Sequence, residues 1–541
     1  MNDLKPLNFE EATVQLTNLL ASIFVLIALL LGASLVASAR AGEFGVDSNA
    51  KEKVEKIVKP TTYTLEVIGL GVTFDKYRQT ALWDILQKGY PYSTIREQDP
   101  NKYPWTGTDK SGVGGGRACD ALENGANLAP MYWGTPTLFA GPPIPAKYHQ
   151  PSAIEPMAGL VSSADITGMS WHLFVTGPWK LAETPDRLLI DVFDFFDAHP
   201  EVPYVVVSSY DSSGARDRFS HYEEPRRLRT GYYIPERPDA TALFILARRE
   251  RVEPLRAFVW DDPDNDFGQE KTRRMYIGLE NSVPSAEKMR DPKYTHGRQP
   301  TVAEWLTAAA EFAQRSDVRS RGLGQLLGGP GHPPRNWKPT PWFPVPWSKQ
   351  QMAAFDHLPT LGFLHRPVFV KLTGEQNQPV SRDERKQLLF KGWQEALLTL
   401  SEDERKRGPA RIIAAFGNDV EHHLALEAAL RDYAAQGGPE IDSGKTAQFI
   451  NTDRRLENTG AATWFMQMAI GVMGSYKAGG VSAAVNLRDK DEASIVFISP
   501  PPADVIERQA GRGDVFRHRV GPAIDPANYK EPALQGSAAV H

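Results

Sequence analysis

The stretch YTLEVIGLGVTF (residues 63–74) decides the fold class of this chain. It is apolar along nearly its whole length and rich in β-branched residues, which predicts a buried strand. The stretch TALWDILQKG (80–89) follows and predicts a short helix, with apolar side chains on one face and Gly89 at its end. A buried strand followed by an amphipathic helix is typical of α/β proteins.

The same alternation continues along the rest of the chain. Apolar runs predict strands over residues 202–208, 242–247, 255–260, 367–372, 411–416 and 494–499. Capping residues and apolar periodicity predict helices over residues 184–199, 301–312, 381–400, 418–437 and 461–478. Residues 90–160 are rich in Gly, Pro and aromatic residues and predict long loops, and the tail after Pro502 is predicted to be irregular.

A proline-rich stretch divides the body of the chain. GGPGHPPRNWKPTPWFPVPW (328–347) holds seven prolines, which suit neither a helix nor a central strand, so we predict an interdomain linker there. Its tryptophans indicate that it packs on a surface. The linker separates a predicted N-terminal α/β domain (61–327) from a C-terminal α/β domain (348–505), which an irregular tail (506–541) follows.

The N-terminal region predicts a membrane anchor. Leu19–Ala39 is a run of 21 residues without a charge, and a helix of that length, at ~1.5 Å per residue, crosses a hydrocarbon core of ~30 Å. We therefore predict a transmembrane anchor over residues 1–41 and a charged tether over residues 42–60. The alternative is a cleaved signal peptide, since Ala37-Ser38-Ala39 resembles a cleavage site. The long apolar run, preceded by a single basic residue, favours the anchor.

Basic residues flank this span unequally. Only Lys5 precedes it, whereas five basic residues follow it before the first predicted strand: Arg40, Lys51, Lys53, Lys56 and Lys59. Lys and Arg are retained on the cytoplasmic side, so we predict a single-pass inner-membrane protein whose body faces the cytoplasm. Cleavage of a signal peptide would instead leave the body in the periplasm.

A second apolar segment, Thr459–Tyr476, is 18 residues long and also lacks charge. It contains Gln467 and three glycines and lies between polar runs within the α/β pattern. A helix buried inside the second domain is therefore favoured over a second membrane span.

The composition excludes several classes of function. The 541 residues carry a net charge of −5 and show no basic stripe, so nucleic acid is not expected as a partner. Cys119 is the only cysteine, which excludes an intramolecular disulfide and a metal site built from several thiolates.

Two short motifs resemble ligand-binding loops but have the wrong residues at key positions. Gly444–Thr446 resembles the end of a phosphate loop, but Pro439 stands where the first glycine is required. Asp261–Gly268 resembles a calcium loop, but Phe267 and Arg273 replace the glycine and the glutamate that such a loop needs. The sequence therefore predicts neither a nucleotide site nor a calcium site.

Other polar groups also lack the context for catalysis. His422 and His423 are adjacent on a predicted helix and point about 100° apart, so they cannot share a metal ion. Ser208-Ser209 with Asp211 resembles a serine site only in outline, and Cys119, in a predicted glycine-rich loop, has no recognisable base. Neither His-Glu-x-x-His nor Gly-x-Ser-x-Gly occurs. We assign no catalytic, metal-binding or cofactor-binding residue, and expect no cofactor.

Several longer stretches resemble one known family, the type VI secretion lipase-adaptor family of bacteria. They are LEVIGLGVTFDKYRQTALWDIL (65–86), DPNKYPW (99–105), PYVVVSSYDS (203–212), NTDRRLENTGAAT (451–463) and AAVNLRDKDEASIVFISPP (483–501). The resemblance implies a non-enzymatic adaptor with N- and C-terminal domains. Such a protein would hold a phospholipase effector in the cytoplasm and hand it to the spike protein of the secretion machine.

A weaker resemblance concerns the fold. VIGLGV (67–72) and the small-residue helix after Asn458 are similar to condensing enzymes of the thiolase-like fold, which implies a degenerate thiolase-like arrangement without the activity. Two alternative functions stay open: a membrane-anchored enzyme that modifies acyl chains or lipids through an unrecognised site, and a structural component of an envelope assembly.

Overall fold

The structure is a computed structural model. It describes residues 63–130, 133–143, 160–164, 172–219, 228–259, 273–278, 300–314, 337–340, 342–343, 346–374, 376 and 378–516. The anchor and tether predicted over residues 1–60, and the whole of the acidic stretch 261–268, lie outside these ranges. Within them, no helix combines the length and apolar character that a membrane crossing requires.

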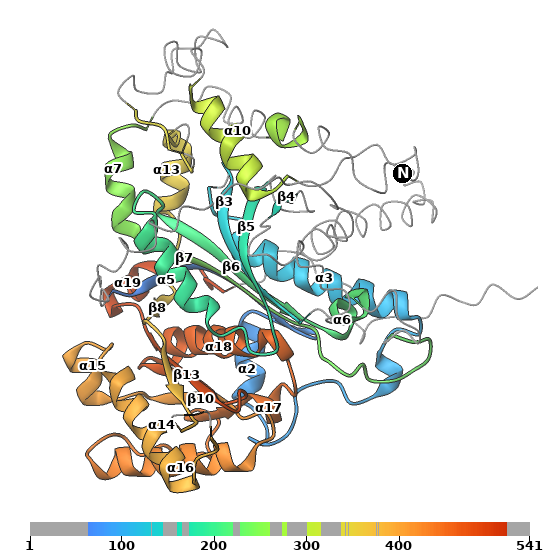
Figure 1. Cartoon of the computed structure of the whole chain (residues 1–541), viewed down its shortest axis with the longest axis vertical. Helices are drawn as coiled ribbons and strands as arrows, with labels where there is room; N and C mark the ends of the chain where they lie inside the picture. Colours follow the sequence, from blue (N-terminus) through green and yellow to red (C-terminus); the bar gives the residue numbers. More distant parts are fainter. Residues whose placement is uncertain are drawn as a thin grey trace, which may run out of the picture.

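The described chain is a mixed α/β protein built on one sheet, as Figure 1 shows. The sheet order is β11-β10-β12-β13-β8-β1-β7-β6-β3-β5-β4, with β2 paired to β1 and β9 to β13. The strands are β1 Leu65–Phe74, β2 Tyr77–Arg78, β3 Thr135–Gly141, β4 Leu160–Ala164, β5 His172–Leu181, β6 Tyr204–Asp211, β7 Ala240–Ala247, β8 Gly362–Leu364, β9 Val368–Lys371, β10 Arg411–Ala415, β11 Phe449–Asn451, β12 Ser482–Asn486 and β13 Glu492–Ser499.

Strands from both sides of the proline-rich stretch meet in the middle of this sheet. β1 pairs antiparallel with β7 on one side and with β8 on the other, where Leu65 lies opposite Leu364. β8 in turn pairs with β13, so the sheet continues from the N-terminal to the C-terminal part of the chain. β3 runs parallel to its two neighbours, β5 and β6. β10 likewise runs parallel to its two neighbours, β11 and β12.

Helices cover this sheet, and most of the sequence-predicted ones are confirmed. They are α2 Thr80–Leu86, α3 Gly107–Ala126, α5 Leu188–Ala198, α6 Ser213–Phe219, α7 Glu253–Arg256, α10 Val302–Gln314, α13 Lys349–Asp356, α14 Arg382–Leu397, α15 Glu402–Arg407, α16 Val420–Ala435, α17 Thr452–Arg455, α18 Thr463–Ala478 and α19 Ala503–Ala510, with short 3₁₀ turns η2 Pro100–Lys102, η4 Arg249–Val252 and η5 Gly460–Ala462. The predicted capping box is present, since Thr301 and Glu304 exchange side-chain to backbone hydrogen bonds.

α18 is a buried helix, as the sequence predicts for the second apolar segment. It packs against β12, β13 and β10 and also against β7 and β1. In its interior, Nε2 of Gln467 donates to the carbonyl oxygens of Ile413 and Val485 at 3.1 and 2.9 Å, while Oε1 has no hydrogen-bond partner among the described residues. These two bonds tie α18 to β10 and β12.

The predicted loop over residues 90–160 is wrong in part, because α3 and β3 lie within it. The glycines that suggest a loop serve instead to bring α3 close to β1. A Cβ on Gly71 would lie 1.7 Å from the carbonyl oxygen of Ala121, and one on Gly125 would lie 2.8 Å from the amide nitrogen of Gly71. Tertiary packing therefore outweighs the low helix propensity of glycine here.

Two other sequence predictions are corrected. A strand is expected over residues 255–260, but residues 255 and 256 belong to α7. This helix has Pro254 in its first turn, and its Leu255 is buried. Proline is well tolerated there because the first amides of a helix have no partner within it. The tail after Pro502 contains α19, whose Gln509 donates to the carbonyl oxygen of Thr360 at 3.1 Å.

The hydrophobic core also joins the two parts of the chain. One cluster contains β1 residues such as Val67 together with α18 residues such as Trp464 and β13 residues such as Val496. Trp342 and Trp347, from the predicted linker, are buried in the same cluster, which confirms that these tryptophans pack against the rest of the protein. The predicted domain ranges thus share one sheet and this core cluster, while a second cluster, which includes Trp393 and Phe416, lies within the C-terminal range alone. The domain boundaries remain predictions.

Candidate protein-interaction surface

The polar groups that resemble catalytic residues in the sequence make structural contacts. The Ser209 hydroxyl donates to the carbonyl oxygen of Ala461 at 3.3 Å. Asp211, fully buried, accepts from Arg216 at 2.6 Å and from the Ala461 amide at 2.8 Å. These bonds tie the end of β6 to η5 and leave no pairing of Ser208 or Ser209 with a base within the described residues.

The two adjacent histidines face different neighbours, as their spacing predicts. His422 is buried, its Nδ1 lies 2.7 Å from the carbonyl oxygen of Leu487, and burial lowers its pKa. The ring of His423 packs on Phe416 at 4.5 Å. Among the described residues, no group of three or more His, Cys, Asp or Glu side chains is arranged to hold a metal ion.

The remaining sequence candidates are also placed by the structure. Gly444–Thr446 lies in a turn where the Asp442 carboxylate accepts from the Gly444 amide at 2.9 Å, so that amide is already bound to an acidic side chain. Cys119 lies within α3 and is buried, rather than in a loop as predicted. Burial of a thiol in an apolar environment disfavours the reactive thiolate.

The surface feature that stands out is the segment between α2 and α3, residues 87–106. It presents three aromatic side chains to solvent: Tyr90 is 78% exposed, Tyr92 51% and Trp105 38%. Aromatic side chains exposed to this extent lose contact with water when a partner binds, and such residues commonly contribute most of the energy of a protein interface.

Arg455, on α17, holds the tyrosine-bearing part of this segment in place. Its guanidinium donates to the carbonyl oxygens of Tyr90 and Ser93 at 2.8 and 2.6 Å and to that of Lys88 at 2.8 Å. The Ile95 amide donates to the Arg455 carbonyl oxygen at 2.9 Å. An arginine 2% exposed, from a distant part of the sequence, therefore fixes the backbone on both sides of Tyr92.

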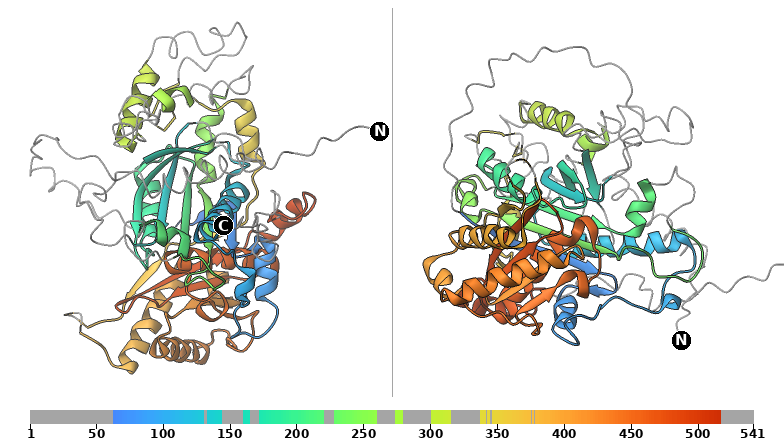
Figure 2. Two further views of the ribbon diagram at one scale, coloured as in Figure 1. Left: turned by 90° about the vertical axis from the view of Figure 1, so that its right-hand side faces the viewer. Right: turned by 60° about the horizontal axis from the view of Figure 1, so that its bottom comes forward.

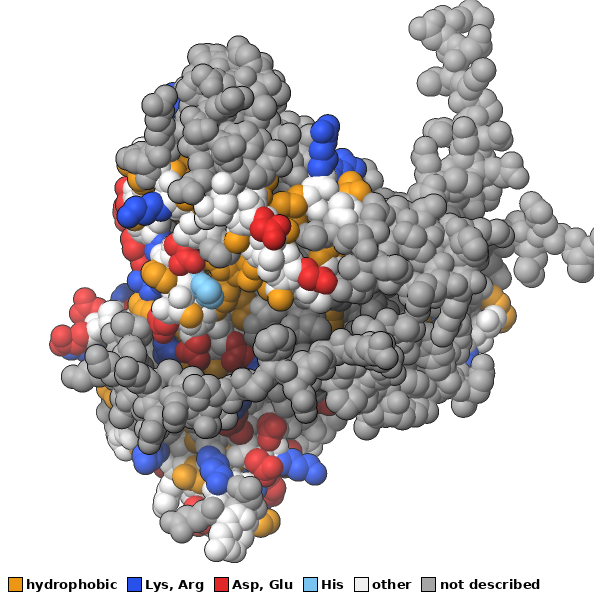
Figure 3. All heavy atoms as spheres, turned by 45° about the horizontal axis from the view of Figure 1, so that its top comes forward, with side chains coloured by type: hydrophobic (Ala, Val, Ile, Leu, Met, Phe, Trp, Pro, Cys, Tyr) orange, Lys and Arg blue, Asp and Glu red, His pale blue; other side chains and the backbone are white. Residues whose placement is uncertain are grey.

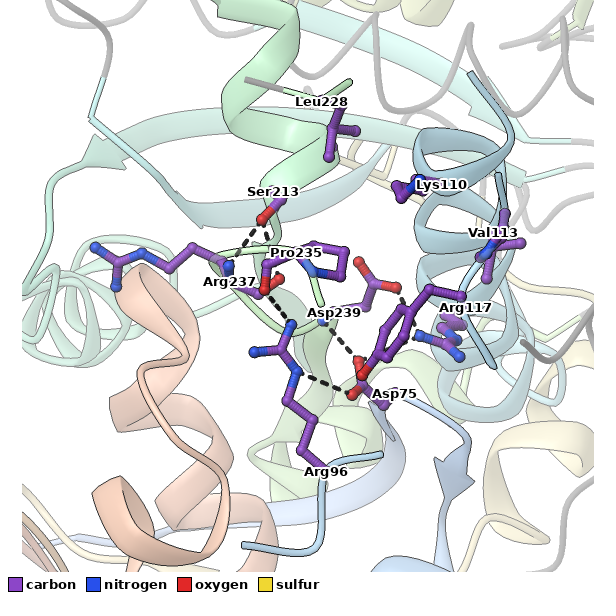
Figure 4. A pocket seen from close by; sticks show the side chains of 13 residues that line it. Asp75, Arg96, Lys110, Val113, Arg117, Ser213, Leu228, Pro235, Arg237 and Asp239 are labelled. Carbon is purple, nitrogen blue, oxygen red and sulfur yellow. Dashed lines mark hydrogen bonds and ion pairs between the residues drawn. The ribbon is translucent and has the colours of Figure 1, made fainter. Parts of the chain in front are cut away.

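A buried ion-pair network supports the next part of the segment, as Figure 4 shows. Arg96 pairs with Asp75 at 3.5 Å and donates to the carbonyl oxygen of Pro235 at 2.5 Å. Arg117, on α3, pairs with Asp75 at 3.2 Å and with Asp239 at 2.7 Å. The cavity among these side chains measures about 10 Å³, enough for about one water molecule, so the network is structural.

Lys110 links Trp105 to the neighbouring segment 228–239. Its ammonium donates to the carbonyl oxygens of Trp105 and Gly231 at 2.9 and 2.8 Å, and burial lowers its pKa to about 8. Across this link the rings of Trp105 and Tyr232 pack edge-on at 4.8 Å. Tyr232 is 39% exposed, so Trp105 and Tyr232 form a second group of exposed aromatic side chains.

These contacts give a surface suited to binding another protein. We call the surface formed by Tyr90, Tyr92, Trp105 and Tyr232 the aromatic surface. Because buried arginines and Lys110 already fix the backbone beneath them, little freedom is lost when a partner binds. Sequence reasoning assigned no interface residue; the only signal was the aromatic and proline-rich composition of this region.

One face of the described part of the molecule carries charged side chains of both signs. On the face in Figure 3, hydrophobic side chains lie among both acidic and basic ones.

One buried acid in the last turn of α3 predicts a pH-dependent stability. Burial, assisted by Asp120, raises the pKa of Glu123 on α3 from 4.5 to about 7. Because the pKa of Glu123 is higher in the folded than in the unfolded state, this group contributes stability that is fully present below about pH 4.5. That contribution is lost as the pH rises through about 7. We expect Glu123→Gln to stabilise the protein by about 1–2 kcal/mol at pH 8, allowing for solvent screening, and much less at pH 4.5.

Urea unfolding of both proteins at pH 4.5 and pH 8 measures this difference. Glu97, on the same surface, is a control because its pKa is lowered, mainly by hydrogen bonds from the Asp99 backbone and Lys76 that overcome its desolvation. Glu97→Gln is expected to destabilise the protein at pH 8. An equal effect of Glu123→Gln at both pH values would contradict the prediction.

Known proteins resemble this chain at two levels. Residues 63–230 match the family model "Type VI lipase adapter protein Tla3, N-terminal", and residues 361–500 match "Type VI lipase adapter protein Tla3, C-terminal". Together the two models cover β1 to β6 and β8 to β13, and Tyr90, Tyr92, Trp105 and Arg455 lie inside the matched ranges.

Solved structures with some similarity include ketosynthases and the protein OleA. The ishigamide ketosynthase/chain length factor is 10% identical, with a TM-score of 0.37, and the match covers 81% of this chain and 99% of that one. OleA from Xanthomonas campestris is 11% identical, with a TM-score of 0.33 over 81% and 98% of the two chains. Similarity this low supports no inference about activity, and the degenerate thiolase-like arrangement stays a prediction.

The two family models match in chain order on either side of the proline-rich stretch, and each includes residues that build the aromatic surface. The sequence resemblance to lipase adaptors is thereby confirmed. This chain belongs to the type VI lipase adapter family.

Proposed function

We propose that this protein is a non-enzymatic adaptor that binds a phospholipase effector in the cytoplasm and supports its loading onto the type VI secretion spike. The observation that carries the proposal is the match of both adapter models. The aromatic surface supports it, because it offers preorganised anchors for a protein partner. Ser209, Asp211 and Cys119 are buried, so none of these residues supports a catalytic function.

Binding of the effector through the aromatic surface is testable by substitution. We expect Tyr90→Ala with Tyr92→Ala to weaken binding at least about tenfold, because removing anchor residues of an interface commonly costs more than about 1.4 kcal/mol. Calorimetry of the purified full chain with a purified candidate phospholipase effector from the same organism measures this change.

Ile277→Ala is the control, since Ile277 is also an exposed hydrophobic side chain, at 42%, but lies outside the aromatic surface. Tyr90→Phe with Tyr92→Phe is expected to retain most of the affinity, because it keeps the rings. Equal binding by the double alanine variant and the wild type would show that the effector docks elsewhere.

We also propose that residues 19–39 anchor the protein in the inner membrane and that the body faces the cytoplasm. The unequal distribution of basic residues around that run supports this orientation. A reporter that is active only in the periplasm, fused to the C-terminus, is expected to be silent. Strong reporter activity would contradict the cytoplasmic orientation and favour cleavage of a signal peptide.

A further inference from the structure

A buried histidine in the C-terminal part of the chain connects three elements away from the aromatic surface. His365 directly follows β8 and is 4% exposed. Its Nδ1 lies 2.7 Å from the carbonyl oxygen of Thr399, in the connection between α14 and α15, and its Nε2 lies 2.7 Å from the hydroxyl oxygen of Ser499 on β13. Figures 1 and 2 show α14, α15 and α16 together at this end of the molecule.

These contacts fix the position of the proton on the neutral ring. A carbonyl oxygen only accepts hydrogen bonds, so Nδ1 carries the proton and donates to Thr399. Nε2 then has no proton, and it accepts from the Ser499 hydroxyl. Ser499 is buried, so water competes little for this bond.

Glu404, on α15, uses the same hydroxyl. Its carboxylate is hydrogen-bonded to Ser499 and also accepts from the Ser401 hydroxyl at 2.6 Å. A carboxylate and an unprotonated ring nitrogen both accept, and the Ser499 hydroxyl has one proton to donate. While His365 is neutral and Glu404 is ionised, Ser499 therefore donates to one of them but not to both.

One added proton removes this competition. When solvent supplies a proton to His365, Nε2 donates to the Ser499 oxygen, and the Ser499 hydroxyl is free to donate to Glu404. The glutamate itself stays ionised. Desolvation raises its pKa, but hydrogen bonds from Ser401 and Ser499 outweigh this effect, and the pKa of Glu404 is lowered.

The other charged groups around the ring have partners of their own. Arg366, the next residue along the chain, pairs with Asp194 on α5 at 2.8 Å. Arg405, on α15, donates to a backbone carbonyl oxygen at 3.5 Å. β13 contributes an uncharged hydroxyl. Glu404 is therefore the charged group that acts on His365 from α15.

Two opposite effects determine the pKa of His365. Burial lowers it below 6.5, and the Thr399 carbonyl and the Glu404 carboxylate offset part of this fall. Relative to the unfolded chain, the stability contributed by the neutral ring is thus fully present above about pH 6.5 and is lost as the pH falls. Relative to a folded chain whose α15 has detached, Glu404 raises the pKa, so by the same linkage protonation favours the attached helix.

We propose that His365, Ser499 and Glu404 form a proton-dependent latch. When His365 binds a proton, the Ser499 hydroxyl turns from His365 to Glu404 and holds α15 more firmly against β13. This latch depends neither on the effector nor on the aromatic surface, so its test is separate from that of the proposed function.

NMR titration of the full chain carrying ¹³C-labelled histidine tests the coupling between His365 and Glu404. The His365 signal is assigned by its loss in His365→Gln. We expect Glu404→Gln to lower the pKa of His365 further, because the attraction of the carboxylate is lost. Glu402→Gln is the matched control on the same helix, where Glu402 pairs with Lys406 at 2.7 Å, and it is expected to leave that pKa unchanged. The same pKa in Glu404→Gln and the wild type would overturn the proposal.

Hydrogen exchange measures the latch itself. Amides of α15, corrected for the intrinsic exchange rate at each pH, are expected to exchange about two- to fivefold more slowly below the measured pKa of His365 than above it, as a partly exposed ionic contact allows. Ser499→Ala removes the hydroxyl that connects His365 to Glu404, so we expect it to abolish this pH dependence. An equal pH dependence in Ser499→Ala and the wild type, or none in the wild type, would show that no latch exists.

Discussion

Arg455→Ala is expected to lower the free energy of unfolding by at least about 3 kcal/mol and to abolish effector binding. The side chain is buried, and it donates to the carbonyl oxygens of Tyr90, Ser93 and Lys88. Each hydrogen bond from a charged group contributes about 1.5–3 kcal/mol, and its removal leaves carbonyl groups without a donor. The same change releases the backbone that positions the two exposed tyrosines.

Arg454→Ala is the matched control for this substitution. Arg454 is the preceding residue on the same short helix, but its side chain is exposed. Surface substitutions of this kind change stability by about 0.5 kcal/mol or less. Urea unfolding of the two variants measures the change in stability, and calorimetry measures the change in effector binding. If Arg454→Ala and Arg455→Ala changed stability and binding equally, the segment 87–106 would not be held by Arg455.

The isolated C-terminal part, residues 350–505, is expected not to fold. β8 lies between β13 and β1 in the sheet, so removal of β1 leaves one edge of the strand without its partner. α18 would also lose its contacts with β1 and β7, which leaves buried apolar side chains such as Trp464 exposed. Loss of a large buried side chain's contacts costs about 3–5 kcal/mol, comparable to the whole stability of many domains.

The measurement for this fragment is circular dichroism during thermal unfolding. We expect no cooperative transition from residues 350–505 alone, and recovery of one when the fragment is expressed together with residues 60–349. A cooperative transition of the isolated fragment would show that the C-terminal part is an independent domain, as the proline-rich stretch suggests from the sequence.

The sequence predicts local structure well where hydrophobic periodicity and capping agree. β1, α14, α16 and α18 lie close to their predicted positions, because each combines a clear apolar pattern with a recognisable start or end. α3 was missed because its glycines, which permit close packing on Gly71, have the composition of a loop.

The candidate site is harder to predict because it depends on contacts between distant residues. Arg455 follows the apparent surface pattern of charged residues in NTDRRLE, yet it is buried against residues 85–95, more than 350 positions earlier. No local pattern distinguishes it from its exposed neighbour Arg454. Exposure of Tyr90 and Tyr92 likewise follows from the position of the segment on the folded surface, since aromatic residues are more commonly buried.

Binding of the purified full chain to a candidate phospholipase effector from the same organism, measured by calorimetry, tests the central claim most directly. The account predicts a saturable complex that is weakened at least about tenfold by Tyr90→Ala with Tyr92→Ala. No binding by the folded wild-type chain would contradict the adaptor function and would favour a structural component of an envelope assembly.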